Sequence, residues 1–192
     1  MRATDARLLR DVSRSFYLSL RVLPRPMRPA VSLAYLLARA SDTLADTAAV
    51  PPKLRMELLD GFIGEMDGGA AAWRSDLSGF SEKQDHSGER ELLERLDEAF
   101  RWLETLAEPQ QVLVREVVAT ITGGQRLDLE RFGETGGVLP DGVALLDYCH
   151  RVAGCVGVFW TRIGFETMGD RFSSSDAALL EKIGEEFGKG LQ

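Results

Sequence analysis

A 192-residue chain with 44% hydrophobic and 28% charged residues has the composition of one soluble globular domain with its own core. The formal net charge of −7 argues against nucleic-acid partners, which need a basic face, so an anionic ligand must be held by local arginines or by a metal ion. No apolar run reaches the roughly 18–20 residues of a membrane span, and the charged N-terminal residues lack a secretion signal, so we expect a cytoplasmic protein without a transmembrane segment.

Apolar residues recur with helical periodicity along the chain, which predicts an all-α protein. Helices are expected over residues 5–22, 30–50, 52–66, 89–106, 109–132 and 141–165, and from the serines at 173–175 to the end. Pro24, Pro26 and Pro29 separate the first two helices, because proline is disfavoured inside a helix. Residues 67–88 are rich in Gly, Ser and charge, and are expected to form a loop with one short helix.

The start of the chain offers an arginine between two hydroxyls. Arg14 stands between Ser13 and Ser15 and is followed by Phe16. Arginine binds phosphate oxygens in bidentate fashion and serine adds neutral donors, so this segment could cradle a phosphate.

The helix expected near residues 30–50 carries a polar stripe on an otherwise apolar surface. Tyr35, Arg39, Asp42 and Asp46 are spaced by four, three and four residues and therefore share one helical face. Two carboxylates in a protein interior need a compensating cation, and their hard oxygen atoms suit Mg²⁺, which shares its other positions with phosphate oxygens. The stripe predicts a metal-bridged diphosphate site with Asp42 and Asp46 as ligands. A solvated helix end, where an Arg39–Asp42 pair contributes about 0.2–0.5 kcal/mol, is the alternative.

Together, SRSF at residues 13–16 and YxxxRxxDxxxD at residues 35–46 resemble the squalene/phytoene synthase family, the head-to-head branch of the trans-prenyl diphosphate synthases. The resemblance implies an all-α prenyl-synthase bundle around a central cavity, with residues 1–192 forming a single domain. It also implies that two farnesyl or two geranylgeranyl diphosphates condense with loss of diphosphate in a Mg²⁺-dependent reaction. NADPH as reductant, and peripheral membrane association for product release, are further implications of the resemblance.

The helix expected over residues 141–165 contains the segment YCHRVAGCVG. Ala153, Gly154 and Gly157 give it a side of small residues, which indicates close packing with another helix in preference to contact with an isoprenoid tail. A lone tyrosine such as Tyr148 is usually a hydrogen-bonded core residue. The segment nevertheless resembles the YCHxVAGxVG segment of the same family, which implies that Tyr148 lies beside the reacting carbons.

The resemblance extends to the last residue of the chain, Gln192, which matches a glutamine that the family follows with a second Asp-rich motif. We therefore expect the C-terminal helices of the fold to lie beyond this sequence, and the 192-residue chain to be catalytically incomplete by itself. Arg126, Asp128 and Arg131 are expected to form a solvated charged face, although the resemblance associates this helix with the substrate cavity. The catalytic residues implied by the resemblance are Tyr148, Asp42 and Asp46, and the substrate-binding ones are Ser13, Arg14, Ser15, Phe16, Tyr35, Arg39, Val152, Gly154 and Gln192.

Several functions remain open at this point. The sequence YCHRVAG is closer to the squalene branch, so a squalene synthase-like enzyme is preferred over a phytoene or dehydrosqualene synthase. A non-enzymatic assembly factor of the same family would be expected to lack the motif Asp or Tyr residues, which are present here. A di-iron carboxylate bundle is disfavoured because the chain has no Glu-x-x-His pair.

Overall fold

The computed structural model describes residues 3–13, 16–133 and 136–192, and these residues form helices and connections without a strand. The predicted all-α class is confirmed. The helices are α1 (Ala3–Ser13), α2 (Phe16–Val22), α3 (Arg28–Asp46), α4 (Pro52–Met66), η1 (Ala71–Asp76), α5 (Leu77–Ser81), α6 (Ser87–Glu94), α7 (Leu96–Leu103), α8 (Glu108–Phe132), α9 (Gly142–Cys149), η2 (His150–Gly154), α10 (Cys155–Met168), η3 (Gly169–Arg171) and α11 (Ala177–Leu191).

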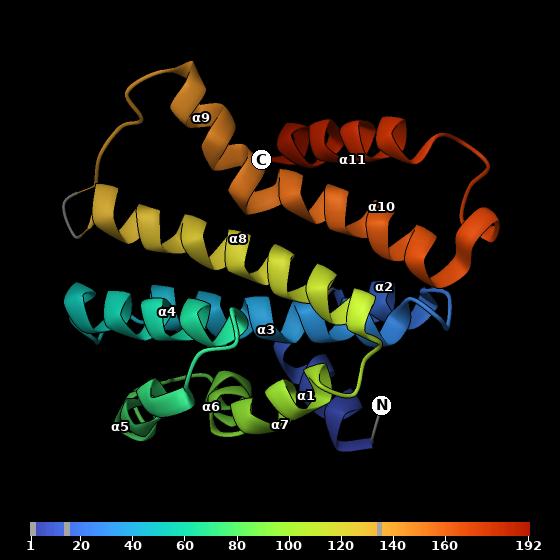
Figure 1. Ribbon diagram of the computed structural model, residues 1–192. Helices are drawn as coiled ribbons and strands as arrows, with labels where there is room; N and C mark the ends of the chain where they lie inside the picture. Colours follow the sequence, from blue (N-terminus) through green and yellow to red (C-terminus); the bar gives the residue numbers. More distant parts are fainter. Residues whose placement is uncertain (1–2, 14–15, 134–135) are drawn as a thin grey trace.

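The long helix α8 lies between two groups of helices (Figure 1). On one side it contacts α3 and α4, and on the other it contacts α10 and the turn η2. Helix α11 packs against α10, while α1, α6 and α7 lie beyond α3 and contact it. The bundle is therefore layered, and α8 and α3 form its centre.

Helix α3 is the most deeply enclosed element. Eleven of its 19 residues are buried, and Leu33, Leu37 and Leu44 are fully inaccessible to solvent. Proline in the first turn fits the observed start at Arg28, because the helix needs no backbone donor there. The expected apolar helix with one polar stripe is thus what the structure contains.

The helix expected over residues 5–22 is described as α1 and α2, and residues 14 and 15 between them lie outside the described residues. Two of the other expected helices are interrupted. The fourth divides at Arg95, whose guanidinium contacts Glu91 in α6 and Glu98 in α7. No glycine or proline marks this break, so residue types alone could not predict it. The loop at 67–88 contains two short helices where one was expected.

The second interruption is a π-helical turn. Residues 141–165 were expected to form one α-helix, but η2 (His150–Gly154) separates α9 from α10. A π turn contains one more residue than an α turn and rotates the side chains that follow it; such turns are frequent at functional sites. Helix α11 also begins differently from the prediction. Asp176 is its N-cap and accepts from the Leu179 amide at 2.8 Å, whereas Ser173 accepts from the Ser175 amide instead.

Helices α10 and α11 cross at very short range because glycines face each other. A Cβ atom added to Gly157 would lie 1.9 Å from the Gly184 carbonyl oxygen, and one added to Gly188 would lie 2.4 Å from the Ala153 carbonyl oxygen. The small-residue side predicted from sequence therefore packs against a helix. This contact fixes the position of α11 over the π turn.

One helical stretch, Gly142–Arg171, is long and apolar enough to cross a membrane by length and composition alone. This differs from the expectation that no stretch would pass that test. A core helix can pass it as well, and one side of this stretch packs against α8 and α11, although only 22% of its most apolar window is buried.

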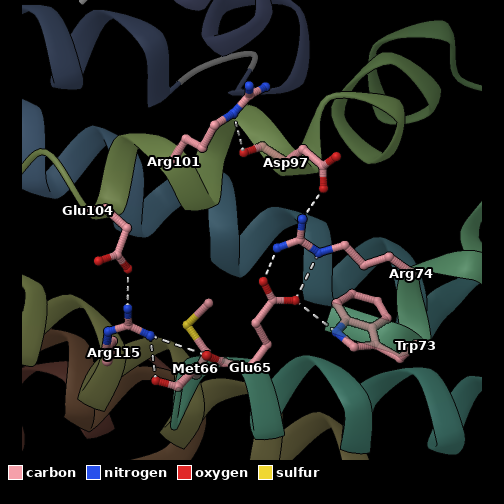
Figure 2. A network of polar contacts seen from close by, with 8 residues as sticks. All are labelled: Glu65, Met66, Trp73, Arg74, Asp97, Arg101, Glu104 and Arg115. Atoms are coloured by element: carbon pink, nitrogen blue, oxygen red, sulfur yellow. Dashed lines mark hydrogen bonds and ion pairs between the residues drawn. The ribbon is translucent and has the colours of Figure 1, made fainter. Parts of the chain in front are cut away.

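A polar network anchors the segment after α4 (Figure 2). The Glu65 carboxylate, only 10% exposed, accepts a hydrogen bond from Trp73 Nε1 at 2.9 Å and from Arg74 Nε at 2.8 Å. The Arg74 guanidinium also pairs with Asp97 of α7. Burial and the positive charge of Arg101 lower the pKa of Arg74. The Glu65 carboxylate thus neutralises the partly buried guanidinium of Arg74.

Arg115 joins the same region to α8 (Figure 2). It donates to the Met66 carbonyl at 2.8 Å and to the Glu104 carboxylate at 2.5 Å. Arg115 thus supplies a donor to a carbonyl oxygen in the last turn of α4, where the helix itself leaves carbonyls without partners.

We expect Glu65→Ala to destabilise the chain by about 3 kcal/mol and to lower the melting temperature by about 6–12 °C, because it leaves buried donors of Trp73 and Arg74 without an acceptor. Circular dichroism during heating measures this. Glu104→Ala is the control, since Glu104 is exposed and should cost at most about 1 kcal/mol. Equal melting temperatures for the two variants would contradict the role given to Glu65.

Gly157→Ala should destabilise the chain by about 2–3 kcal/mol, because the added methyl group overlaps the backbone of α11. Gly190→Ala is the matched control in α11, since a Cβ there meets no atom within 4 Å and a helical alanine gains about 0.5–1 kcal/mol. Urea unfolding of both variants gives the comparison. The close crossing would be disproved if Gly157→Ala were as stable as Gly190→Ala.

Candidate active site

The polar stripe of α3 faces a cleft of about 790 Å³. The opposite wall comes from α8 and from the segment around the π turn. Its polar lining includes Tyr35, Arg39, Asp42, Asp46, Gln125, Asp128 and Tyr148, and its apolar lining includes Phe16, Ile121, Leu129, Phe132 and Val152. The cleft thus has an acidic part on α3 and an apolar wall on α8.

Arg39 lies between two carboxylates. Its NH1 group donates to Asp42 Oδ2 at 2.5 Å, and its NH2 group pairs with Glu89 of α6. The helix-surface pair that formed the alternative interpretation therefore exists, but it lies in the wall of a cleft. Asp46, one turn further along α3, is exposed.

The carboxylates of α3 repel each other. Burial raises the pKa of Asp42, the negative charge of Asp46 raises it further, and the Arg39 guanidinium offsets only part of the effect. The ionised site therefore lacks positive charge. A bound cation would supply it.

Asp128 brings another carboxylate to the cleft. Burial raises its pKa, Arg131 lowers it and Asp46 raises it. Its Oδ1 atom is buried and, within the described residues, has no hydrogen-bond partner. The expected solvated face holds for Arg126, which pairs with Asp60 at the surface, and for Arg131, which is exposed, but not for Asp128. Residues two apart on a helix point in different directions, so the spacing of Arg126 and Asp128 could have indicated that the two side chains do not share one face.

Tyr148 lies across the cleft from α3. Burial raises the pKa of its phenol, and so does the negative charge of Asp128, while a hydrogen bond with the Gln192 side chain lowers it. Val152, one turn later, lines the same cleft. Residues four apart share one helical face, so both side chains lie on the wall of the cleft.

Of the remaining predicted site residues, some line the cleft and others do not. Phe16 lines the cleft with its ring centroid 5.8 Å from that of Tyr35. Gly154 does not line it: a Cβ at Gly154 would lie 3.1 Å from Lys189 Cγ, so this residue faces α11. Arg14 and Ser15, and the side chain of Ser13, lie outside the described residues.

A model of the squalene/phytoene synthase family matches residues 9–192. The chain belongs to the squalene/phytoene synthase family. This membership agrees with the two motifs that meet in the cleft, one on α3 and one around the π turn.

The squalene synthase of Schizosaccharomyces pombe is 26% identical over 96% of this chain and 38% of the relative. The probable squalene synthase of Neurospora crassa is 30% identical over 97% of this chain and 37% of the relative. The solved structure of TcSQS with the ligand E5700 superimposes with a TM-score of 0.68 and 25% identity, covering 94% of this chain and 49% of that one. This squalene/phytoene synthase chain therefore spans less than two-fifths of the length of these curated relatives.

We expect Asp42→Asn to raise the melting temperature at pH 7, without added metal, by about 2 °C. The folded-state pKa of Asp42 lies above the ordinary 3.8, so the ionised form of Asp42 is disfavoured in the folded chain. The stability that protonated Asp42 contributes is therefore lost as the pH rises from 3.8 through the folded-state pKa. The difference from the wild type should therefore narrow as the pH falls towards 4. Calorimetry at several pH values measures it.

Asp60→Asn is the control, because it removes a carboxylate from an exposed ion pair with Arg126 and should not stabilise the chain. A lower melting temperature for Asp42→Asn at pH 7 would mean that the ion pair with Arg39 outweighs the repulsion.

Proposed function

We propose that this chain forms the first diphosphate-binding half of a prenyl-transferring enzyme of the squalene synthase type. The substrate would be farnesyl diphosphate, and the reaction would be the head-to-head condensation of two such molecules. The observation that carries the proposal is that Asp42, Asp46 and Arg39 share one cleft with Tyr148 and an apolar wall.

The acidic residues fit a divalent cation. Asp42 and Asp46 offer hard oxygen atoms one helical turn apart. Burial and then the negative charge of Asp46 raise the pKa of Asp42, although Arg39 lowers it. Asp42 and Asp46 would hold Mg²⁺. When bound, Mg²⁺ would neutralise the diphosphate and favour its departure.

The other residues have separate roles in this proposal. Arg39 would bind phosphate oxygens, since a guanidinium has five N–H donors and only two of its groups are taken by carboxylates. Ile121, Leu129 and Phe132 would bind the isoprenoid chain and exclude water from a carbocation. Tyr148 would face the reacting carbons, where its ring can stabilise positive charge.

Two features favour the squalene branch over the phytoene branch. The curated relatives reported above are squalene synthases, and the segment around Tyr148 is closer to that branch. The presence of Asp42, Asp46 and Tyr148 also supports an enzyme over a non-enzymatic assembly factor.

Calorimetric titration tests the proposal by binding, because the chain spans less than two-fifths of the length of its curated relatives. We expect inorganic diphosphate to bind only with Mg²⁺ present, and Asp46→Asn to weaken that binding at least about tenfold. A farnesyl thiodiphosphate should bind more tightly than diphosphate, because its tail contacts the apolar wall.

Asp60→Asn is again the control and should bind like the wild type. Diphosphate binding that is independent of Mg²⁺, or unchanged in Asp46→Asn, would refute the proposed metal site. Equal affinities for diphosphate and the farnesyl analogue would refute the apolar wall as a binding surface for the tail.

A further inference from the structure

Glu89 lies just outside the cleft and touches its central arginine. It is in the first turn of α6, on a different element from the motif of α3, and 50 residues separate it from Arg39. With a side chain 19% exposed, it is less exposed than either Arg39 or Asp42. It lines a second, smaller cavity of about 430 Å³ and does not line the main cleft.

Arg39 forms part of the wall between these two cavities. It lines both, and so do Asp42 and Asp46. Asp42 holds one terminal nitrogen of the guanidinium, and Glu89 holds the other. Its Nε atom is buried and has no acceptor among the described residues. Two carboxylates from two helices therefore fix this guanidinium, and neither alone occupies both nitrogens.

The position of Glu89 is built into the fold. Helix α6 contacts both α1 and α3. The preceding residue, Gly88, is buried, and a Cβ there would lie 3.3 Å from Val12 Cγ1. A small residue at this position lets the first turn of α6 pack closely against α1. A carboxylate in a first turn is also favoured by the helix dipole.

We infer that Glu89 is a positioning residue that keeps Arg39 at the wall of the cleft when Asp42 binds the metal ion. This inference rests on the proposed function. A cation on Asp42 competes with Arg39 for the same carboxylate, so the Arg39–Asp42 pair weakens when the metal binds. Glu89 lines the second cavity and not the cleft, so it keeps its contact with Arg39. The guanidinium then stays beside the metal site with donors free for phosphate oxygens.

Without Glu89, Asp42 would be the only carboxylate paired with Arg39 among the residues that the structure describes. Metal and arginine would then exclude each other, and either the metal would bind less well or the arginine would leave the wall. Partners that orient the groups of a metal site typically change metal affinity about 10–100-fold when removed. The same range is expected here for the ternary complex of chain, Mg²⁺ and diphosphate.

The test is titration of the 192-residue chain with inorganic diphosphate in the presence of Mg²⁺. Glu89→Gln should weaken binding about tenfold. Glu91→Gln is the matched control, because Glu91 lies in the same helix and pairs with Arg7 and Arg95, away from the cleft. It should bind diphosphate like the wild type.

A double-mutant cycle separates positioning from simple loss of stability. In the Arg39→Gln background, Glu89→Gln should have no further effect on diphosphate binding, because the group that it positions is gone. The ¹H–¹⁵N signal of Arg39 Nε supplies a second measurement. With Mg²⁺ it should stay protected from exchange in the wild type and lose that protection in Glu89→Asp, which keeps the charge but shortens the side chain.

The outcomes are distinct. If the wild type does not bind diphosphate with Mg²⁺, the proposed function fails and this role of Glu89 fails with it. If the wild type binds, but Glu89→Gln binds as well as Glu91→Gln or more tightly, only the role of Glu89 is overturned. Equal effects of Glu89→Gln with and without Arg39, or unchanged exchange of Arg39 Nε in Glu89→Asp, would also overturn it.

Discussion

The buried position of α3 is the constraint on which the rest of the structure depends. Most of its surface is covered by neighbouring helices, with Leu33, Leu37 and Leu44 fully buried, yet it carries two carboxylates and a guanidinium on one face. Covering that face with apolar side chains would leave ionised groups in a low-dielectric interior, at a cost of several kcal/mol for each ion. The surrounding helices must therefore leave it open. The cleft is the consequence of a polar stripe on a helix that is otherwise part of the core.

The opposite wall of the cleft depends on the π turn and on the glycine crossing together. Within one short segment, Tyr148 and Val152 face the cleft, whereas Gly154 and Gly157 face α11. The extra residue of the π turn changes the direction of the side chains between α9 and α10. The absence of side chains at the crossing lets α11 lie directly over this turn, so that its last residue, Gln192, reaches the phenol of Tyr148. The close glycine crossing and the candidate site residue Tyr148 thus belong to the same segment of the chain.

The sequence predicted the helices and the α3 stripe because both depend on local spacing. Residues three and four apart on a helix share a face whatever surrounds them, so Tyr35, Arg39, Asp42 and Asp46 could be grouped from the sequence. The break at Arg95 and the π turn could not be predicted, because no proline marks either of them. Glu89 could not be placed either, since its contact with Arg39 joins positions 50 residues apart. Gly154 was assigned to the cleft from resemblance, but the glycine crossing turns it towards α11.

The charges around the cleft explain why one face of α3 carries both acidic and basic residues. Among the described residues, Asp42, Asp46 and Asp128 line the cleft. Burial raises the pKa of Asp42 and of Asp128, Asp46 raises both further, and the nearby arginines offset only part of this. A site with carboxylates alone would bind a cation but repel a diphosphate. A site with arginines alone would bind the diphosphate but no metal. Arg39 placed between Asp42 and Glu89 meets both needs, because the carboxylates keep the guanidinium in place while the excess negative charge remains available to a divalent cation. The repulsion between these carboxylates is offset by the apolar burial of the same helix.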